Sequence, residues 1–148
     1  MNARDAVDSK SICVEYDLPF PPAKVWRLLT EADLLSGWLM VNDIRPVVGH
    51  AFTFKAQPMP GWDGIVHCEV LEVVPHERLR YSWRGGAEGA RLDSTVTWTL
   101  SASATGTRLA LEHSGFVPVN AFAFDVMSKG WRGGKMVELM KEQLARTA

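Results

Sequence analysis

Two residues in predicted strands could take part in acid–base chemistry, His113 and Glu69. His113 shares the alternation phase of Leu109 and Leu111, so we expect its imidazole to point into the interior. A buried imidazole could act as a general base or orient a ligand carbonyl, and it could equally be a structural group bonded to the backbone. Glu69 lies in a strand whose apolar phase changes at Leu71, which predicts a bulge. If the bulge turns Glu69 inward, Glu69 and His113 could form an acid–base pair.

No pattern in the sequence predicts a metal ion or a cofactor. Cys13 and Cys68 form no CxxC pair. His67 is adjacent to Cys68, so their side chains leave opposite faces of a strand and cannot bind one ion together. The facing of His67 and Cys68 depends on where the bulge falls. The chain has no Walker loop, no GxGxxG after a strand and no GxSxG. We therefore expect neither a metal site nor a cofactor.

The elements that must position these residues are predicted by the spacing of apolar side chains. Alternation predicts a first strand at residues 11–18 and about five antiparallel strands between residues 50 and 115, joined by short turns. The Pro19–Pro22 stretch ends the first strand, because proline cannot donate to a sheet. Apolar residues at helical spacing follow, and they predict a helix that restarts at Asp33 as a second short helix ending at Gly37.

The last element is predicted to be an amphipathic helix at residues 126–146. Its apolar residues recur at three-and-four spacing, namely Met136, Val137, Met140 and Leu144. The pair Gly133-Gly134 predicts a bend or a late helix start, which lets Trp131 and Met140 both reach the interior. A sheet with one apolar face needs this helix as its cover. The sequence therefore predicts an α+β fold, in which a curved antiparallel sheet of about six strands wraps around a long C-terminal helix. The first strand is expected at an edge or paired with the last.

Composition and charge exclude several classes of protein. The chain of 148 residues has 16 basic and 17 acidic residues, a formal net charge of −1 and no basic patch, so nucleic acid is not an expected partner. No apolar run approaches the roughly 20 residues of a membrane span, and residues 1–10 contain no apolar signal region. We predict one cytoplasmic domain at residues 11–146 with reduced thiols, a disordered tail at residues 1–10 and no membrane partner. A homodimer is left open.

Several short motifs, in this order and at this spacing, resemble one protein family. They are residues 20–30, 34–38, 72–83, 96–98, 106–109, 113–116 and 130–131, which read FPPAKVWRLLT, LLSGW, EVVPHERLRYSW, VTW, GTRL, HSGF and GW. The sequence is similar to the activator of heat-shock-protein-ninety ATPase homologue family, in the START-like (SRPBCC) helix-grip superfamily, over residues 11–146. It departs from that family at its end. There the family has leucines four and seven residues after the tryptophan, and this chain has Lys135 and Glu138.

The resemblance implies a helix-grip fold whose cavity, between the sheet and the C-terminal helix, receives a small apolar molecule. By strand phase, with residues at the strand ends and on the last helix added, the candidate lining is Trp38, Phe52, Phe54, Tyr81, Trp83, Trp98, Leu111, His113, Phe116, Trp131 and Met140. The same side chains could instead fill the core, because aromatic rings bury large areas.

Three functions are compatible with this sequence. The first is binding of a small hydrophobic molecule, aromatic or lipid-like, for carriage, sequestration or sensing. The second is a cyclase- or hydrolase-type enzyme, which would need two titratable groups that converge inside the cavity. The third, action on a chaperone ATPase, is implied by the family's name alone.

The entrance to the cavity is expected between residues 115–125 and the start of the last helix. Three phenylalanines, Phe116, Phe122 and Phe124, lie in this part of the chain, with Gly115 and Pro118 beside them. Apolar side chains flanked by glycine hinges are typical of lids, and the same rings could form a fixed plug. The sequence leaves both alternatives open.

Overall fold

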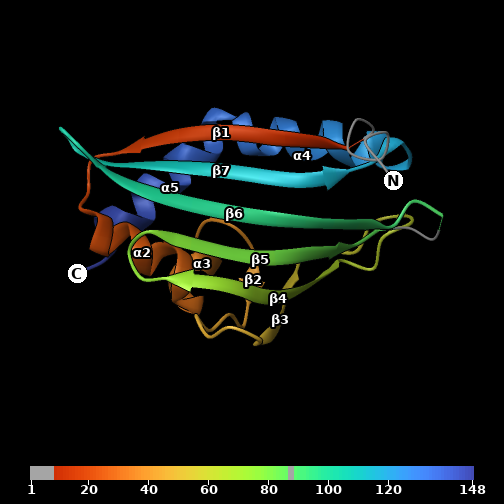
Figure 1. Ribbon diagram of the computed structural model, residues 1–148, viewed down its shortest axis with the longest axis horizontal. Helices are drawn as coiled ribbons and strands as arrows, with labels where there is room; N and C mark the ends of the chain where they lie inside the picture. The colour runs from red at the N-terminus through yellow and green to blue at the C-terminus, as the bar shows by residue number, and fades with distance from the viewer. Residues whose placement is uncertain (1–8, 87–88) are drawn as a thin grey trace.

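One antiparallel sheet of seven strands organises the fold, in the order β1-β7-β6-β5-β4-β3-β2 (Figure 1). The computed structural model describes residues 9–86 and 89–148. The strands are β1 (Lys10–Leu18), β2 (Val41–Asn42), β3 (Ala51–Lys55), β4 (Ile65–Val74), β5 (Arg78–Gly85), β6 (Leu92–Ser103) and β7 (Gly106–Phe116). The predicted antiparallel sheet is confirmed. Of the predicted tail, residues 1–8 lie outside the described residues, and Lys10 already belongs to β1.

Two helices follow β1, and two more end the chain. The first pair, α2 (Pro22–Thr30) and α3 (Ala32–Ser36), confirms the prediction of two short helices. Pro22 suits the first turn of α2, because the backbone N–H that proline lacks would have no partner there. A 3-10 turn, η1 (Pro118–Asn120), leads into α4 (Ala121–Arg132), which is followed by α5 (Gly134–Arg146). No helix among the described residues is long and apolar enough to cross a membrane.

The strand pairing agrees with the sequence prediction for the position of β1 and for the bulge in β4. β1 lies at one edge of the sheet and pairs with β7, the last strand. The bulge predicted in β4 is present, as a register shift between Val70 and Glu72 against β5. Near it, the backbone N–H of Glu69 donates to the hydroxyl of Ser82 at 2.9 Å. At the other edge, β2 has two residues, which is too short to show an alternation pattern.

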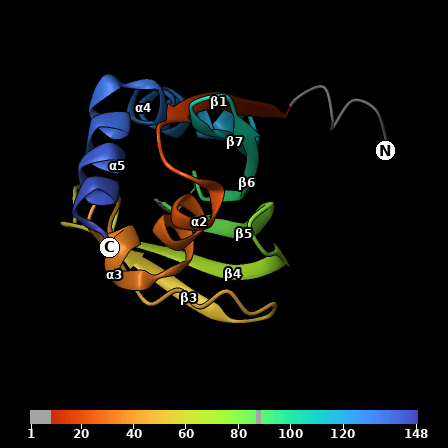
Figure 2. The same cartoon turned by 90° about the vertical axis from the view of Figure 1, so that its left-hand side faces the viewer.

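The C-terminal helix differs from the prediction in where it begins and in being divided. It begins at Ala121 instead of residue 126, and Gly133 separates α4 from α5 with extended dihedrals (φ −68°, ψ 144°). The bend predicted at Gly133-Gly134 is therefore a complete break in the helix. As expected, Trp131 and Met140 are both buried on the interior side. Figure 2 shows that the sheet curls until β1 and β3 lie on opposite sides, while α5 crosses the open side between them.

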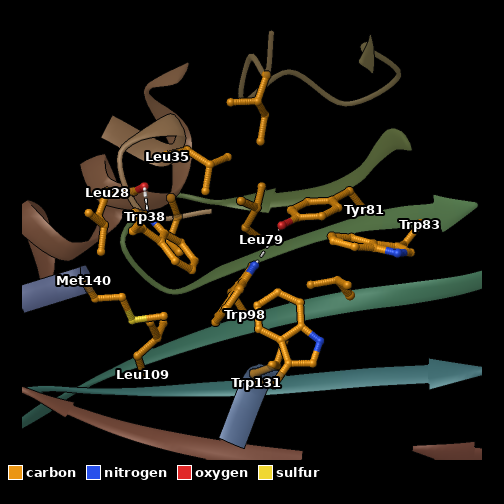
Figure 3. Close-up of a cluster of buried hydrophobic side chains, with 14 of the residues drawn as sticks. Leu28, Leu35, Trp38, Leu79, Tyr81, Trp83, Trp98, Leu109, Trp131 and Met140 are labelled. Atoms are coloured by element: carbon orange, nitrogen blue, oxygen red, sulfur yellow. Dashed lines mark hydrogen bonds between the residues drawn. The ribbon is translucent and has the colours of Figure 1, made fainter. Parts of the chain in front are cut away.

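Aromatic rings fill the space between the sheet and the helices (Figure 3). Trp98 on β6 is fully buried at its centre. Its ring packs edge-on against Trp38, with the ring centroids 5.9 Å apart, and against Trp131 at 5.7 Å. Its indole N–H donates to the hydroxyl of Tyr81 at 3.0 Å. These edge-to-face pairs are favourable beyond the area they bury, so the interior is a packed core.

Replacing Trp98 with alanine is expected to lower the free energy of unfolding by about 3–5 kcal/mol, because the truncation leaves a large cavity in a packed core. Urea denaturation of the two proteins would measure the difference. Phe122→Ala is the matched control, since Phe122 is also aromatic but is 82% exposed, and its truncation is expected to change stability by no more than about 0.5 kcal/mol. A loss below about 1 kcal/mol at Trp98 would contradict a packed core at this position.

Candidate functional site

A pocket of about 540 Å³ is lined by η1 and the start of α4, which follow the end of β7. Figure 1 shows that this end of β7 points away from α2 and α3. The first wall of the pocket comes from η1 and the start of α4: Val119, Asn120, Phe122, Ala123, Val126 and Met127. The remaining walls come from the β3–β4 loop, from the ends of β5 and β6 and from the chain before β2: Met59, Pro60, Gly61, Trp62, Gly85, Gly86, Ala90, Leu92 and Met40. Two side chains on the inner face of the sheet, Val66 and Trp83, also line it.

The described lining of the pocket carries few polar side-chain groups, and those of Trp62 and Asn120 are already bonded within the protein. None of these residues is an acid, a base, a cysteine or a tyrosine. The indole N–H of Trp62 donates to the carbonyl of Ile65 at 3.2 Å. The amide of Asn120 is bonded on both sides to backbone groups. The pocket therefore offers an apolar surface and no described side chain that could transfer a proton.

Large apolar side chains at the rim of the pocket remain in contact with water. Phe122 on α4 is 82% exposed, and Val119, Val126 and Met59 are also exposed. Exposed apolar residues that occur singly on a protein surface need no explanation, whereas a group of them around a concave surface is typical of a binding site.

A chain of hydrogen bonds connects Trp83, which lines the pocket, with the core behind it. An indole N–H can only donate, so the contact of Trp131 Nε1 with Nδ1 of His113 at 3.1 Å makes Nδ1 the acceptor. The neutral imidazole then carries its hydrogen on Nε2, which donates to the Ser94 hydroxyl oxygen at 2.8 Å. Ser94 in turn donates to the carbonyl of Trp83 at 2.7 Å. Geometry alone therefore assigns the tautomer of His113.

His113 is a bonded structural group in this arrangement. It points inward as predicted and is fully buried. Burial lowers the pKa of His113 to about 3, because the charged imidazolium would lose its hydration. Both ring nitrogens are engaged, so neither can accept a proton from a ligand without breaking a bond. Of the two alternatives left open by the sequence, the structural one agrees with these contacts.

The acid–base pair considered for His113 and Glu69 does not form. The bulge follows Val70, so Val66, Cys68 and Val70 keep the inward phase. Glu69 is consequently exposed on the outer face of β4, while His113 is buried inside the sheet.

His67 is also exposed, and the neighbouring Cys68 thiol is buried. Burial raises the pKa of Cys68, which keeps the thiol protonated. Among the described residues, no group of three His, Cys, Asp or Glu side chains is placed to hold a metal ion.

Most residues proposed from strand phase as the cavity lining are buried in the core. Of the eleven, Trp83 lines the pocket. The others are buried and do not belong to its lining: Trp38, Phe52, Phe54, Tyr81, Trp98, Leu111, His113, Phe116, Trp131 and Met140. Strand phase identifies inward side chains but does not tell a cavity wall from a filled core.

The pocket residues that the sequence reasoning missed lie in loops and in the first turns of α4. Residues 57–64, QPMPGWDG, belong to the short turns that the sequence predicts between strands, yet this loop supplies Met59 and Trp62. The sequence feature that could have indicated these two residues is the presence of large apolar side chains in a segment rich in proline and glycine. The segment 115–125 was expected at the entrance, and part of it does form a wall of the pocket.

The three phenylalanines of that segment have different surroundings. Phe116 is buried, and its ring packs edge-on against Phe124 with the centroids 5.3 Å apart. Phe122 lies in water at the rim. A plug in which all three rings pack therefore does not form, and a lid remains a prediction.

The buried His113 predicts a specific dependence of stability on pH. The unfolded chain takes up a proton near pH 6.5, whereas folded His113 stays neutral down to about pH 3. The stability that neutral His113 contributes is thus fully present above pH 6.5 and is lost as the pH falls, by up to about 1.4 kcal/mol per pH unit. Urea denaturation between pH 7 and pH 4.5 would measure this slope. His113→Gln is expected to flatten it, and His67→Gln, an exposed matched control, is expected to keep it. Equal slopes in the two variants would contradict the assignment.

Comparisons with known proteins agree with this fold. Over residues 19–142 the sequence matches the family described as "Activator of Hsp90 ATPase homolog 1-like protein". The crystal structure of protein MLL2253 from Mesorhizobium loti superposes with a TM-score of 0.84 and 39% identity, covering 94% of this chain and 99% of that chain. No significant match is found among curated proteins.

Two more distant structures share the fold. Protein BH1534 from Bacillus halodurans, solved in solution, gives a TM-score of 0.73 with 23% identity, covering 91% of this chain and 96% of that chain. Protein Mll3558 from Rhizobium loti gives a TM-score of 0.76 with 20% identity, covering 91% and 96%. Together with the curled sheet and its C-terminal helices, the family match shows that this chain belongs to the activator of Hsp90 ATPase homologue 1-like family and has the helix-grip fold.

Proposed function

We propose that the protein binds a small, uncharged, apolar molecule in the pocket at the start of α4, for carriage, sequestration or sensing. The observation that supports this most is the pocket itself. It encloses about 540 Å³, within the range of about 300–1,000 Å³ that is usual for small-molecule sites. Its described lining is apolar, and its rim carries apolar side chains that the fold leaves in water, with Phe122 82% exposed.

The lining also favours a particular ligand chemistry. Trp62 and Trp83 can pack against a flat ring, and aromatic pairs are favourable beyond their buried area. Met40, Met59 and Met127 have flexible, polarizable side chains that adapt to irregular shapes. A charged group buried among these residues would lose its hydration without gaining a partner. We therefore propose a neutral ligand with a flat aromatic or branched apolar body.

The same observations favour binding over catalysis of the cyclase or hydrolase kind. Such catalysis needs titratable groups within hydrogen-bonding reach of the substrate. The described lining contains none, and His113, behind Trp83, has both nitrogens bonded to protein groups. The family's description names the ATPase of Hsp90. The feature of this chain that carries our proposal is a concave pocket sized for a small molecule.

The proposal predicts that the neutral dye N-phenyl-1-naphthylamine binds in the pocket, and that Val126→Asp weakens binding at least about tenfold, since the short carboxylate would be desolvated against the ligand. Dye fluorescence would measure the affinity. Val48→Asp is the matched control, because Val48 is an exposed valine outside the pocket. If the two variants bind the dye equally well, the dye does not bind in this pocket.

A pair of dyes tests the ligand chemistry in the wild-type protein. The anionic 8-anilinonaphthalene-1-sulfonate has the same ring system with a sulfonate added. We expect it to bind at least about tenfold more weakly than the neutral dye, because the sulfonate would have to leave water. Equal or tighter binding of the sulfonate would contradict an uncharged ligand.

A further inference from the structure

Asn120 is a polar residue in the lining of an apolar pocket, and all its hydrogen-bonding groups face the protein. It ends η1, immediately before α4, and is 2% exposed. Its side-chain oxygen accepts the backbone N–H of Val117 at 3.1 Å. Its side-chain nitrogen donates to the carbonyls of Ala90 at 3.2 Å and Arg91 at 3.1 Å. The opposite orientation of the amide would set its oxygen against two carbonyl oxygens, so the contacts themselves assign which atom is nitrogen.

The two donated bonds, which we call the amide bridge, join two walls of the pocket. One wall is α4, which begins at the next residue, and the other includes Ala90 and Leu92 at the start of β6. Within the part of the chain that the structure describes, no other hydrogen bond connects η1 or α4 with Ala90–Leu92 or with Gly85 and Gly86. Among the hydrogen bonds of the described residues, the amide bridge alone joins these two walls.

We propose that Asn120 is a positioning residue that sets the distance between these walls, and through it the affinity of the pocket for an apolar ligand. The inference rests on the function proposed above. Dispersion contacts weaken steeply with distance, and a gap of about 0.5–1 Å removes a quarter to a half of their energy. A ligand between α4 and the start of β6 contacts both walls only while the bridge holds them together. The Val117 bond does not have this role, because it closes η1 on itself.

Asn120→Asp separates the two roles of the side chain. The carboxylate keeps an acceptor for the N–H of Val117 and loses both donors of the amide bridge. Its second oxygen faces the carbonyls of Ala90 and Arg91, which repels the wall. Burial and the two carbonyl oxygens raise the pKa of the introduced carboxyl above its usual value of roughly 3.9. When the carboxyl is protonated, it can donate one hydrogen bond back to a carbonyl.

The measurement is the affinity of N-phenyl-1-naphthylamine for wild type and Asn120→Asp at pH 8 and pH 5.5. At pH 8 we expect the variant to bind at least about tenfold more weakly, as two bridge bonds are lost. At pH 5.5 the difference is expected to narrow to within about threefold, because one bond returns. Thr107→Val is the matched control. Like Asn120→Asp, it removes a hydrogen bond that a buried side chain donates to a backbone carbonyl. Here the donor is the Thr107 hydroxyl and the acceptor is the carbonyl of Phe20, at the opposite end of β7. Thr107→Val is expected to keep the wild-type affinity at both pH values.

Two results would overturn the inference while leaving the proposed function intact. One is that Asn120→Asp binds the dye as tightly as the wild-type protein at both pH values. Asn120 would then serve only to accept the Val117 N–H within η1. The other is an equal loss of affinity in Thr107→Val, which would show that the loss in Asn120→Asp does not come from the amide bridge. Failure of the wild-type protein to bind the dye would instead refute the proposed function.

A second measurement needs no variant and keeps the inference testable if Asn120→Asp does not fold. Hydrogen exchange of the wild-type protein would be followed with and without the dye. We expect the dye to slow exchange in residues 119–127 and at residues 90–92 together, because the amide bridge couples the two walls. Slowing in residues 119–127 alone would overturn the coupling.

Discussion

The attachment of Trp131 to the sheet at two atoms is the interaction on which the arrangement of the C-terminal helices depends. Its indole N–H donates to His113 on β7, and its backbone carbonyl accepts a hydrogen bond from the hydroxyl of Tyr16 on β1. That carbonyl has no partner inside α4, because the helix stops at Gly133. Burial raises the pKa of Tyr16, which keeps the hydroxyl protonated and able to donate. The junction between α4 and α5 is thereby held on the two strands at one edge of the sheet.

Because the junction between α4 and α5 is fixed on the sheet, α5 and the first turn of α4 have different surroundings. Beyond the break, α5 turns Met140 and Leu144 into the interior, where both are fully buried. In the other direction, α4 runs away from Trp131 to a first turn whose Phe122 lies in water. The rings around Trp131 fill the space that a helix-grip fold could leave open (Figure 3). The open volume is therefore displaced to the start of α4, where the chain has only loops and a 3-10 turn to cover the end of the sheet.

The sequence predicted what depends on periodicity and left open what depends on packing. Alternation placed Trp98 and His113 inside and located the bulge in β4, because a strand has only two faces. It could not tell whether an inward ring lines a cavity, because that depends on the volumes of rings from other elements. It also missed the pocket at Met59 and Asn120, since loop residues have no phase. The prediction also began the last helix at residue 126, whereas α4 begins at Ala121.

The distribution of polar atoms explains why this site is suited to binding. Among the described residues, every buried side-chain nitrogen and oxygen has a hydrogen-bond partner. Within the core those bonds orient large rings, as the indole of Trp98 on Tyr81 and that of Trp131 on His113 illustrate. A group used in this way cannot also hold a substrate or carry its proton, because the existing bond would have to break and a buried polar group would be left without a partner. The described surface of the pocket is mainly apolar, so it distinguishes ligands chiefly by shape and by excluding charge. Asn120 follows the same rule, since its amide determines where the walls stand and leaves no donor for the ligand.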